Sequence, residues 1–293
     1  MNHLGEISKL TNIAKPTMSV ITNVGTSHIG ELGSRENILK AKLEILEGMN
    51  EESPAIINND NDMLHNWYLQ NKDKKRIITF GIENESDVMA KNIYTDEKGS
   101  KFTVEIDGKE HEITINVGGK HFISNSLCAI CVGIENGIEI EQIIKGVKEF
   151  ELTKRRMEML EGINNTHIIN DCYNASYDSM KASIEYLASL NGNKRIAVLG
   201  DMLELGEFEQ ELHEKVGEEI YINKIDILIT LGKRAKYIAD KAKNLGMNAE
   251  NIFIFDTKEE TIKKLKEIVK KDDYILVKAS NGMHFEEIVE GMI

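Results

Sequence analysis

Several features are scarce or missing in this chain of 293 residues, and each absence removes a class of protein. Three cysteines are too few for the disulfide framework of a small secreted domain. No signal peptide opens the chain and no apolar run approaches membrane-spanning length, so we expect a cytoplasmic protein without membrane insertion. The net charge of −13 and the lack of clustered Lys and Arg make a nucleic-acid partner unexpected.

Two short motifs are incomplete. Cys128 and Cys131 form a C-x-x-C, but it lies in an apolar helical stretch without a second pair, which favours buried thiols over zinc or redox chemistry. The phosphate-binding string G-x-x-x-x-G-K-[ST] is absent. Its nearest approach, residues 117–121, lacks the upstream glycine and the following hydroxyl residue.

The rest of the composition is that of an ordinary globular protein, with 41% hydrophobic and 29% charged residues. Residues 19–46 organise the first half. A β-branched run at 20–22 predicts a buried strand, the following loop carries His28, and Ser34 is placed to cap a helix that carries Lys42. In open α/β sheets ligands bind beyond the carboxyl ends of strands, so chemistry is expected at this loop.

Further strands follow. Residues 55–60 predict a strand that ends in a polar cluster, where Asp60 is either a site residue or a turn former. Alternating residues over 77–117, with a tight turn at Asp107-Gly108, predict an antiparallel meander.

Strand and helix patterns alternate over residues 165–293 and predict a Rossmann-like, doubly wound domain. Four apolar runs, at 195–200, 227–232, 252–255 and 274–278, follow a first strand near 168–170. Met180, Ile184 and Leu187 give the helix after that first strand a core-facing stripe. No G-x-G-x-x-G is present, so a dinucleotide is not implied.

Separated motifs in both halves resemble one family. Residues 22–28 (TNVGTSH), 40–45 (KAKLEI), 171–175 (DCYNA) and 200–206 (GDMLELG) resemble the Mur ligases, closest to the branch that adds D-alanyl-D-alanine to UDP-MurNAc-tripeptide. The resemblance covers essentially the whole chain. It implies an α/β fold with residues 1–152 as the remainder of the central ATPase domain and 153–293 as the Rossmann-like C-terminal domain. The UDP-binding domain, the P-loop and a glutamate ligand of relatives would precede Met1.

The resemblance also implies a set of site residues. His28 would bind Mg²⁺, and Lys42, carbamylated by CO₂, would help to hold a second Mg²⁺; both count as catalytic. The groups implied for ATP are Asn125, Arg156, Asp171 and Asn174, and those implied for the substrate are Tyr173, Lys278 and Ser280. Mg²⁺ prefers hard oxygen ligands, which a carbamate supplies.

Four of these residues have plainer roles when each is taken alone, and the chain departs from the family pattern at three places. His28 could be a surface or hydrogen-bonded residue, and Lys42 could extend from a helix face to water. Asn125 could cap a helix, and Arg156 could be solvated surface. The departures from the pattern are Phe122 where relatives have Asn, Ser176-Tyr177 where they continue Asn-Pro, and Asn281 where they have Arg. The last of these removes a charge that could hold a carboxylate or phosphate.

The expected activity is ATP-dependent amide formation through an acyl phosphate, with UDP-MurNAc-tripeptide and D-Ala-D-Ala as substrates of the full-length enzyme. Without the P-loop, we expect this chain alone not to turn over ATP. Two alternatives remain: another amide ligase of the superfamily, such as a folylpolyglutamate synthase, and a non-catalytic or partner-dependent half-enzyme.

Overall fold

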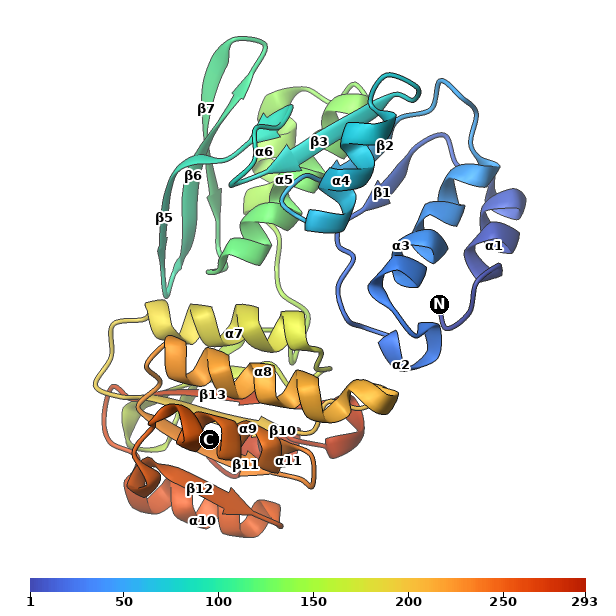
Figure 1. Cartoon of the computed structure of the whole chain (residues 1–293). Coiled ribbons are helices and arrows are strands. Elements are labelled where there is room, and N and C mark those ends of the chain that lie inside the picture. The colour runs from blue at the N-terminus through green and yellow to red at the C-terminus, as the bar shows by residue number, and fades with distance from the viewer. The chain divides into compact units, whose positions relative to one another are not determined.

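The computed structural model describes residues 1–293, and the chain forms two compact units, Met1–Glu151 and Leu152–Ile293 (Figure 1). Each unit has its own sheet and its own buried core. None of the helices combines the length and apolar character needed to cross a bilayer.

The first unit is built on a four-stranded parallel sheet. Its strands, in spatial order, are β1 (Ser19–Ile21), β2 (Ala55–Asn58), β3 (Ile77–Gly81) and β4 (Val88–Met89). Ala55, Ile56 and Ile57 are all buried, as expected for a parallel strand covered on both faces. Helix α5 (Lys120–Glu135) packs against β2 and β3, and α4 (Asp62–Asn71) follows β2.

The segment around β1 forms the helical part of this unit. It contains α1 (Glu6–Ala14), the short α2 (Ile29–Leu32) and α3 (Arg35–Leu43), which continues as a 3₁₀ turn, Glu44–Gly48. The predicted cap is confirmed, because the Ser34 side chain accepts a hydrogen bond from the Asn37 backbone N–H. The buried Glu44 carboxylate accepts from the N–H groups of Gly5 (2.7 Å) and Ser8 (3.1 Å), so it caps α1 from a distant part of the chain.

A separate antiparallel sheet contains β5 (Lys91–Asp96), β6 (Gly99–Ile106) and β7 (Lys109–Ile115). The predicted turn is confirmed, with positive φ at Asp107 (51°) and Gly108 (72°). The predicted start of the meander at residue 77 is wrong, because β3 and β4 pair in parallel within the first sheet. Side-chain alternation does not distinguish the two kinds of pairing, since the long-range partner decides the direction.

Helix α5 carries the C-x-x-C. Both thiols are buried, as predicted, and burial raises the pKa of Cys128 to about 11 and that of Cys131 to about 12. A thiol held protonated in this way is a poor nucleophile and a poor metal ligand. Helix α6 (Ile140–Lys148) packs along α5.

The second unit has a six-stranded sheet in the order β12-β11-β10-β13-β9-β8. The five parallel strands are β9 (Thr166–Asn170), β10 (Arg195–Gly200), β11 (Ile227–Leu231), β12 (Ile252–Phe255) and β13 (Tyr274–Lys278). These are the five strands that the apolar runs predict. Edge strand β8 (Glu158–Gly162) pairs antiparallel with β9.

Helices cover both faces of this sheet, which confirms the doubly wound fold (Figure 1). One face carries α7 (Tyr177–Ser189), α8 (Glu209–Ile222) and α9 (Ala235–Leu245), and the other carries α10 (Lys258–Ile268) and α11 (Glu286–Glu290). Met180, Ile184 and Leu187 of α7 are all fully buried, as predicted.

A glycine in the second unit makes a stability test possible. Gly232 follows β11 with φ +125°, and a Cβ atom built there would lie 2.3 Å from Asp201 Oδ1. Asp201 is buried and accepts from the N–H groups of Arg234 (3.0 Å) and Ala235 (2.8 Å), so it caps α9. We therefore expect Gly232→Ala to destabilise the protein by more than about 2 kcal/mol, measured from the urea midpoint.

The matched control is Gly282→Ala in the same unit. A Cβ atom at Gly282 meets only Leu203, at an ordinary distance of 3.4 Å, so its midpoint should stay close to that of the parent. If both variants lost the same amount of stability, the contact between the new Cβ atom and Asp201 would not be the cause of the loss in Gly232→Ala.

Candidate functional site

Polar residues of the second unit gather where the parallel strands end. The chain leaves β10 toward α8 on one face, and it leaves β13 toward α11 on the other. In open α/β sheets such a reversal opens a crevice at the carboxyl edge, where ligands bind. Three of the predicted site residues, Asp171, Lys278 and Ser280, lie at this edge and are buried.

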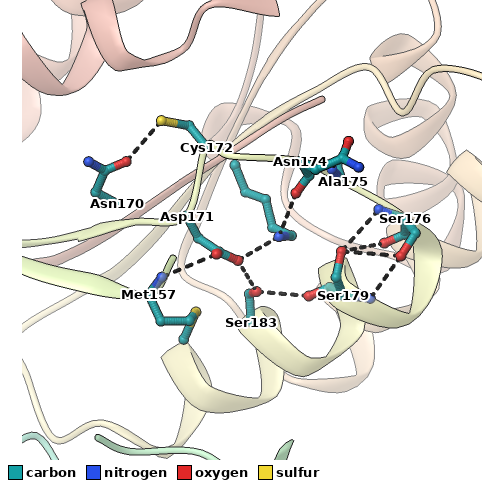
Figure 2. A network of polar contacts seen from close by, with 10 residues as sticks. Met157, Asn170, Asp171, Cys172, Asn174, Ala175, Ser176, Ser179 and Ser183 are labelled. Atoms are coloured by element: carbon teal, nitrogen blue, oxygen red, sulfur yellow. Dashed lines mark hydrogen bonds and ion pairs between the residues drawn. The ribbon is translucent and has the colours of Figure 1, made fainter. Parts of the chain in front are cut away.

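Asp171 and Lys278 form an ion pair inside the unit. Figure 2 shows Asp171 among its other polar contacts, with Met157 on one side and Ser183 on the other. Lys278 Nζ lies 2.5 Å from Asp171 Oδ2 and also donates to the backbone carbonyl of Asn174 (3.0 Å). Asp171 accepts two more hydrogen bonds, from Ser183 Oγ (2.7 Å) and from the Met157 N–H (3.1 Å). Both side chains are therefore occupied by other protein groups, and the predicted contacts of this pair with ATP and substrate remain predictions.

The loop that follows β9 presents exposed groups. Tyr173 and Asn174 are both exposed, and the guanidinium of exposed Arg156 lies 4.0 Å from the centre of the Tyr173 ring. This cation–π contact orients a positive charge beside an aromatic face. The loop ends in a capping box at Ser176 and Ser179, which begins α7 (Figure 2). The structure thus brings Arg156, Tyr173 and Asn174 together, as a site for an anionic or planar ligand requires.

Ser280, which follows β13, forms two hydrogen bonds with the loop after β10. Ser280 Oγ accepts a hydrogen bond from the Leu203 N–H (2.9 Å), and the Ser280 N–H donates to the Asp201 carbonyl (3.1 Å). Ser280, predicted to bind substrate, therefore joins the ends of β13 and β10. That predicted contact is not tested by this geometry.

His213 is a residue that sequence reasoning missed. It is fully buried on α8, its Nε2 accepts from the Met202 N–H (2.9 Å), and its Nδ1 lies 2.5 Å from the Glu209 carbonyl. These partners define a neutral ring with the proton on Nδ1. The one feature of the sequence that could have indicated its burial is its helical spacing with Val216 and Ile220. All three residues lie on the buried face of the helix.

His213 gives the protein a pH-dependent stability. Burial is the largest cause that lowers its pKa below the ordinary 6.5. The unfolded chain therefore takes up a proton at a higher pH than the folded chain does. As the pH falls from about 6.5 to the lower folded pKa, this difference removes stability; above about 7 it has no effect.

We expect the loss of stability between about pH 7 and pH 5 to be smaller in His213→Gln than in the parent. Urea midpoints at several pH values measure it. The variant should also be less stable at pH 7, because the buried Met202 N–H loses its ring acceptor. His3→Gln, at an exposed position, is the control and should lose as much stability between pH 7 and pH 5 as the parent does. If His213→Gln also lost as much stability as the parent over this pH range, the prediction would be wrong.

In the first unit, His28 and Lys42 lie around the loop after β1. His28 has φ 64° and directly precedes α2, while Lys42 Nζ donates to the Asn23 carbonyl in the same loop. The loop is held in place by Asn61 Nδ2, which donates to Asn23 Oδ1 (2.8 Å). Arg35 also holds it, through the carbonyl of Val24 (2.8 Å). The predicted pair therefore borders one loop, at the carboxyl end of a parallel strand.

The side chains near this loop offer few ligands for Mg²⁺. No group of three or more His, Cys, Asp or Glu side chains is placed to hold a metal ion in residues 1–293. An unmodified Lys42 ammonium repels a cation. A carbamate on Lys42 would replace this cation with an anionic oxygen donor of the kind that Mg²⁺ prefers, and the assignment of His28 and Lys42 to Mg²⁺ stays a prediction.

Asp60 has a structural part in this unit. Its carboxylate accepts from the backbone N–H groups of Ile82 (2.6 Å), Glu83 (3.0 Å) and Asn84 (2.8 Å). This geometry organises the turn after β3, so of the two roles left open for Asp60 the turn former is favoured.

Asn125 lies on the exposed side of α5, at a groove of about 420 Å³ between α5 and α6. The groove is mainly apolar, with Phe122, Ile138 and Phe150 among its lining residues. Asn125 does not cap the helix, because the N-cap position is Gly119. The helix-cap role is therefore excluded, and the contact of Asn125 with ATP stays a prediction that this geometry does not test.

The family comparisons agree with this architecture. Residues 1–133 match the family model of the Mur ligase middle domain, and residues 155–281 match that of the Mur ligase glutamate ligase domain. The chain belongs to the Mur ligase family.

Two relatives with the same name illustrate the similarity within this family. The chain is 39% identical over 295 residues to the UDP-N-acetylmuramoyl-tripeptide–D-alanyl-D-alanine ligase of Bacillus subtilis (strain 168), covering 100% of this chain and 63% of the relative. It is 29% identical to the Escherichia coli (strain K12) ligase of the same name, covering 99% of this chain and 63% of the relative. The chain thus spans less than two thirds of the length of these relatives.

Solved structures agree on the fold. A crystal structure of MurF from Acinetobacter baumannii matches with a TM-score of 0.89 and 26% identity, over 99% of this chain and 62% of that one. MurF from Thermotoga maritima in complex with ADP matches with a TM-score of 0.85 and 27% identity, over 99% and 64%. The predicted fold class, a central α/β domain with an antiparallel meander followed by a Rossmann-like domain, is confirmed.

Proposed function

We propose that this chain is the nucleotide-binding and C-terminal part of a ligase that joins D-alanyl-D-alanine to UDP-MurNAc-tripeptide. The observation that carries the proposal is that relatives with this name match the chain over essentially its whole length, across both units. The proposed boundary between the two family domains is the one expected from the sequence, with residues 1–152 and 153–293.

The proposed reaction has two steps. The tripeptide carboxylate attacks the γ-phosphorus of ATP, which forms an acyl phosphate and releases ADP. The amine of D-Ala-D-Ala then attacks the acyl carbon, and an amide forms as phosphate leaves. In such phosphoryl transfer most of the catalysis comes from positioning and from stabilising charge.

In the first unit, we assign His28 and carbamylated Lys42 to Mg²⁺, which would offset charge on the transferring phosphate. The support is their shared loop at the carboxyl end of β1. Asn125 is assigned to the adenine. Its exposed amide offers both a donor and an acceptor, beside a groove with aromatic walls.

In the second unit, two of the exposed groups are assigned to ATP and the third to the substrate. Arg156 supplies a positive charge for phosphate oxygens and Asn174 supplies polar contacts, while Tyr173 offers a ring edge to the substrate. Arginine suits phosphate recognition because its planar donors pair with two oxygens at once. Ser280 is retained as a proposed substrate contact.

No observation favours the other amide ligases. The likeness to a folylpolyglutamate synthase from Thermotoga maritima, at 16% identity and a TM-score of 0.62, shows the fold alone. The other alternative is a non-catalytic or partner-dependent half-enzyme. The following experiment distinguishes it from the main proposal.

Calorimetric titration with Mg·ATP and bicarbonate tests the proposal, on this chain and on a form extended upstream to the length of its relatives. We expect the extended form to bind ATP and to release phosphate only when tripeptide and D-Ala-D-Ala are both present. The short chain should not turn over ATP, because the backbone cradle for the phosphates is absent from its sequence. An extended form that binds ATP but forms no amide would contradict the proposal.

A further inference from the structure

Helix α7 begins at a residue whose side chain reaches the neighbouring helix. Tyr177 is the first residue of α7 and directly follows the capping residue Ser176. Its hydroxyl donates a hydrogen bond to Glu219 Oε1 on α8 (3.0 Å), and α7 and α8 pack side by side (Figure 1). This bond joins the start of α7 to a residue 42 positions further along the chain.

Glu219 accepts this bond while it is buried. The residue is 7% exposed, and its carboxylate also accepts from Lys181 Nζ (2.9 Å) and from Asn223 Nδ2 (3.3 Å). Burial and the bond to Glu219 raise the pKa of Tyr177 to about 12, so the hydroxyl keeps its proton and remains a donor. A hydrogen bond to a charged acceptor is stronger than one between neutral groups, so this bond is a firm anchor for the helix.

The first turn of α7 in turn holds the end of the loop that follows β9 (Figure 2). The Ser176 N–H donates to Ser179 Oγ (3.0 Å), and the Ser179 N–H donates back to Ser176 Oγ (3.4 Å). The Met180 N–H donates to the Ser176 carbonyl (2.8 Å). The exposed residues Tyr173 and Asn174 lie just before this turn, so a turn tied to α8 also restricts the loop that carries them.

Proline is often found at the first position of a helix, because its fixed φ suits the helix and its missing N–H is not needed there. The family pattern has proline at position 177, and this chain has tyrosine. A side-chain bond to a neighbouring helix can restrict the same turn that a proline ring would restrict through the backbone. The two devices are interchangeable in effect, although they act on different parts of the residue.

We infer that Tyr177 and Glu219 are positioning residues, which hold the first turn of α7 and thereby keep Tyr173 and Asn174 in place to meet a ligand. They act through the loop, so neither needs a ligand contact of its own. The inference rests on the proposed function in one respect, namely that Asn174 binds the nucleotide.

Three single variants test this role. Tyr177→Phe removes the hydroxyl and keeps the ring, while Lys181 still pairs with Glu219, so no buried charge is left alone. Tyr177→Pro also removes the hydroxyl but fixes the backbone. The backbone of Ser176 is extended (φ −136°, ψ 164°), as a residue before proline prefers. The matched control is Tyr221→Phe, which removes a hydroxyl from an exposed ring on α8.

Amide hydrogen exchange at Ser176 and Met180 in this chain measures how firmly the turn is held, and calorimetry with Mg·ADP on the upstream-extended protein measures binding. We expect exchange at both amides to be about tenfold faster in Tyr177→Phe, and ADP affinity to fall by a similar factor. Tyr177→Pro should recover about two- to fivefold of each loss, because proline restricts the loop before the ligand binds. Tyr221→Phe should match the parent in both measurements.

Two results would overturn the inference. One is exchange at Ser176 and Met180 that stays at the parent rate in Tyr177→Phe, whatever the ADP affinity. The other is a Tyr177→Pro variant that is no better than Tyr177→Phe in either measurement, because the hydroxyl itself would then be needed rather than a fixed turn. If the extended parent binds no Mg·ADP, the nucleotide assignment of Asn174 is wrong, and the exchange rates still decide whether the bond holds the turn.

Discussion

Lys42→Met is expected to lower the ligase rate of the upstream-extended protein by about 10²- to 10³-fold, the size of effect seen when one preorganised charge-stabilising group is lost. The methionine keeps the length and most of the volume of the side chain on α3, but it cannot form a carbamate. The carbamate would then be missing from the loop that follows β1, where the Lys42 amine lies against the Asn23 carbonyl. Phosphate release with tripeptide and D-Ala-D-Ala measures the rate.

Two further variants decide what the lysine supplies. Lys42→Arg keeps a positive charge and cannot be carbamylated, so it should be as slow as Lys42→Met. Lys40→Met, an exposed position on the same helix, should keep the parent rate. Parent activity should also fall when CO₂ and bicarbonate are removed from the buffer. A Lys42→Arg enzyme with parent activity would show that a positive charge is what the site needs, and the carbamate assignment would be wrong.

Lys278→Met is expected to destabilise the second unit by about 3–5 kcal/mol, because it leaves Asp171 buried without its partner. Replacing both residues, as Asp171→Asn with Lys278→Met, should cost less than Lys278→Met alone, since no unpaired charge then remains. Lys258→Met is the surface control: its partner Glu287 is 56% exposed, and the pair is worth about 1 kcal/mol or less.

Two spectroscopic probes can show which unit has lost stability in Lys278→Met. The single tryptophan, Trp67, lies on α4 of the first unit, so its fluorescence follows the unfolding of that unit. Circular dichroism follows both units. We expect Lys278→Met to shift a transition seen by circular dichroism and to leave the tryptophan transition in place. A variant with the parent's urea midpoint by both probes would contradict the buried-pair argument.

Local features of the fold could be predicted because neighbouring residues determine them. The Ser34 cap depends on a side chain that reaches the N–H three residues later. The stripe of Met180, Ile184 and Leu187 follows from the period of a helix, and the turn at Asp107-Gly108 follows from residues that tolerate positive φ. Each of these predictions needed no information from elsewhere in the chain.

The environment of the site residues could not be predicted, because distant segments determine it. The insertion of β13 between β10 and β9 places Lys278 beside Asp171, and no local pattern specifies that strand order. The same is true of His213, whose partners come from the loop after β10 and from its own helix. The direction of β3 was misjudged for this reason too, since its partner β2 lies in another segment of the chain.

The sequence by itself therefore determined the elements, the family and the types of residue at the strand ends, because propensity, periodicity and short motifs act within a few residues of one another. The tertiary structure alone decided which of those polar residues are exposed. Arg156, Tyr173 and Asn174 face solvent, whereas Asp171 and Lys278 are buried against each other. Burial depends on the packing of strands and helices that are distant in sequence, so no pattern within a few residues could predict which of these groups are enclosed.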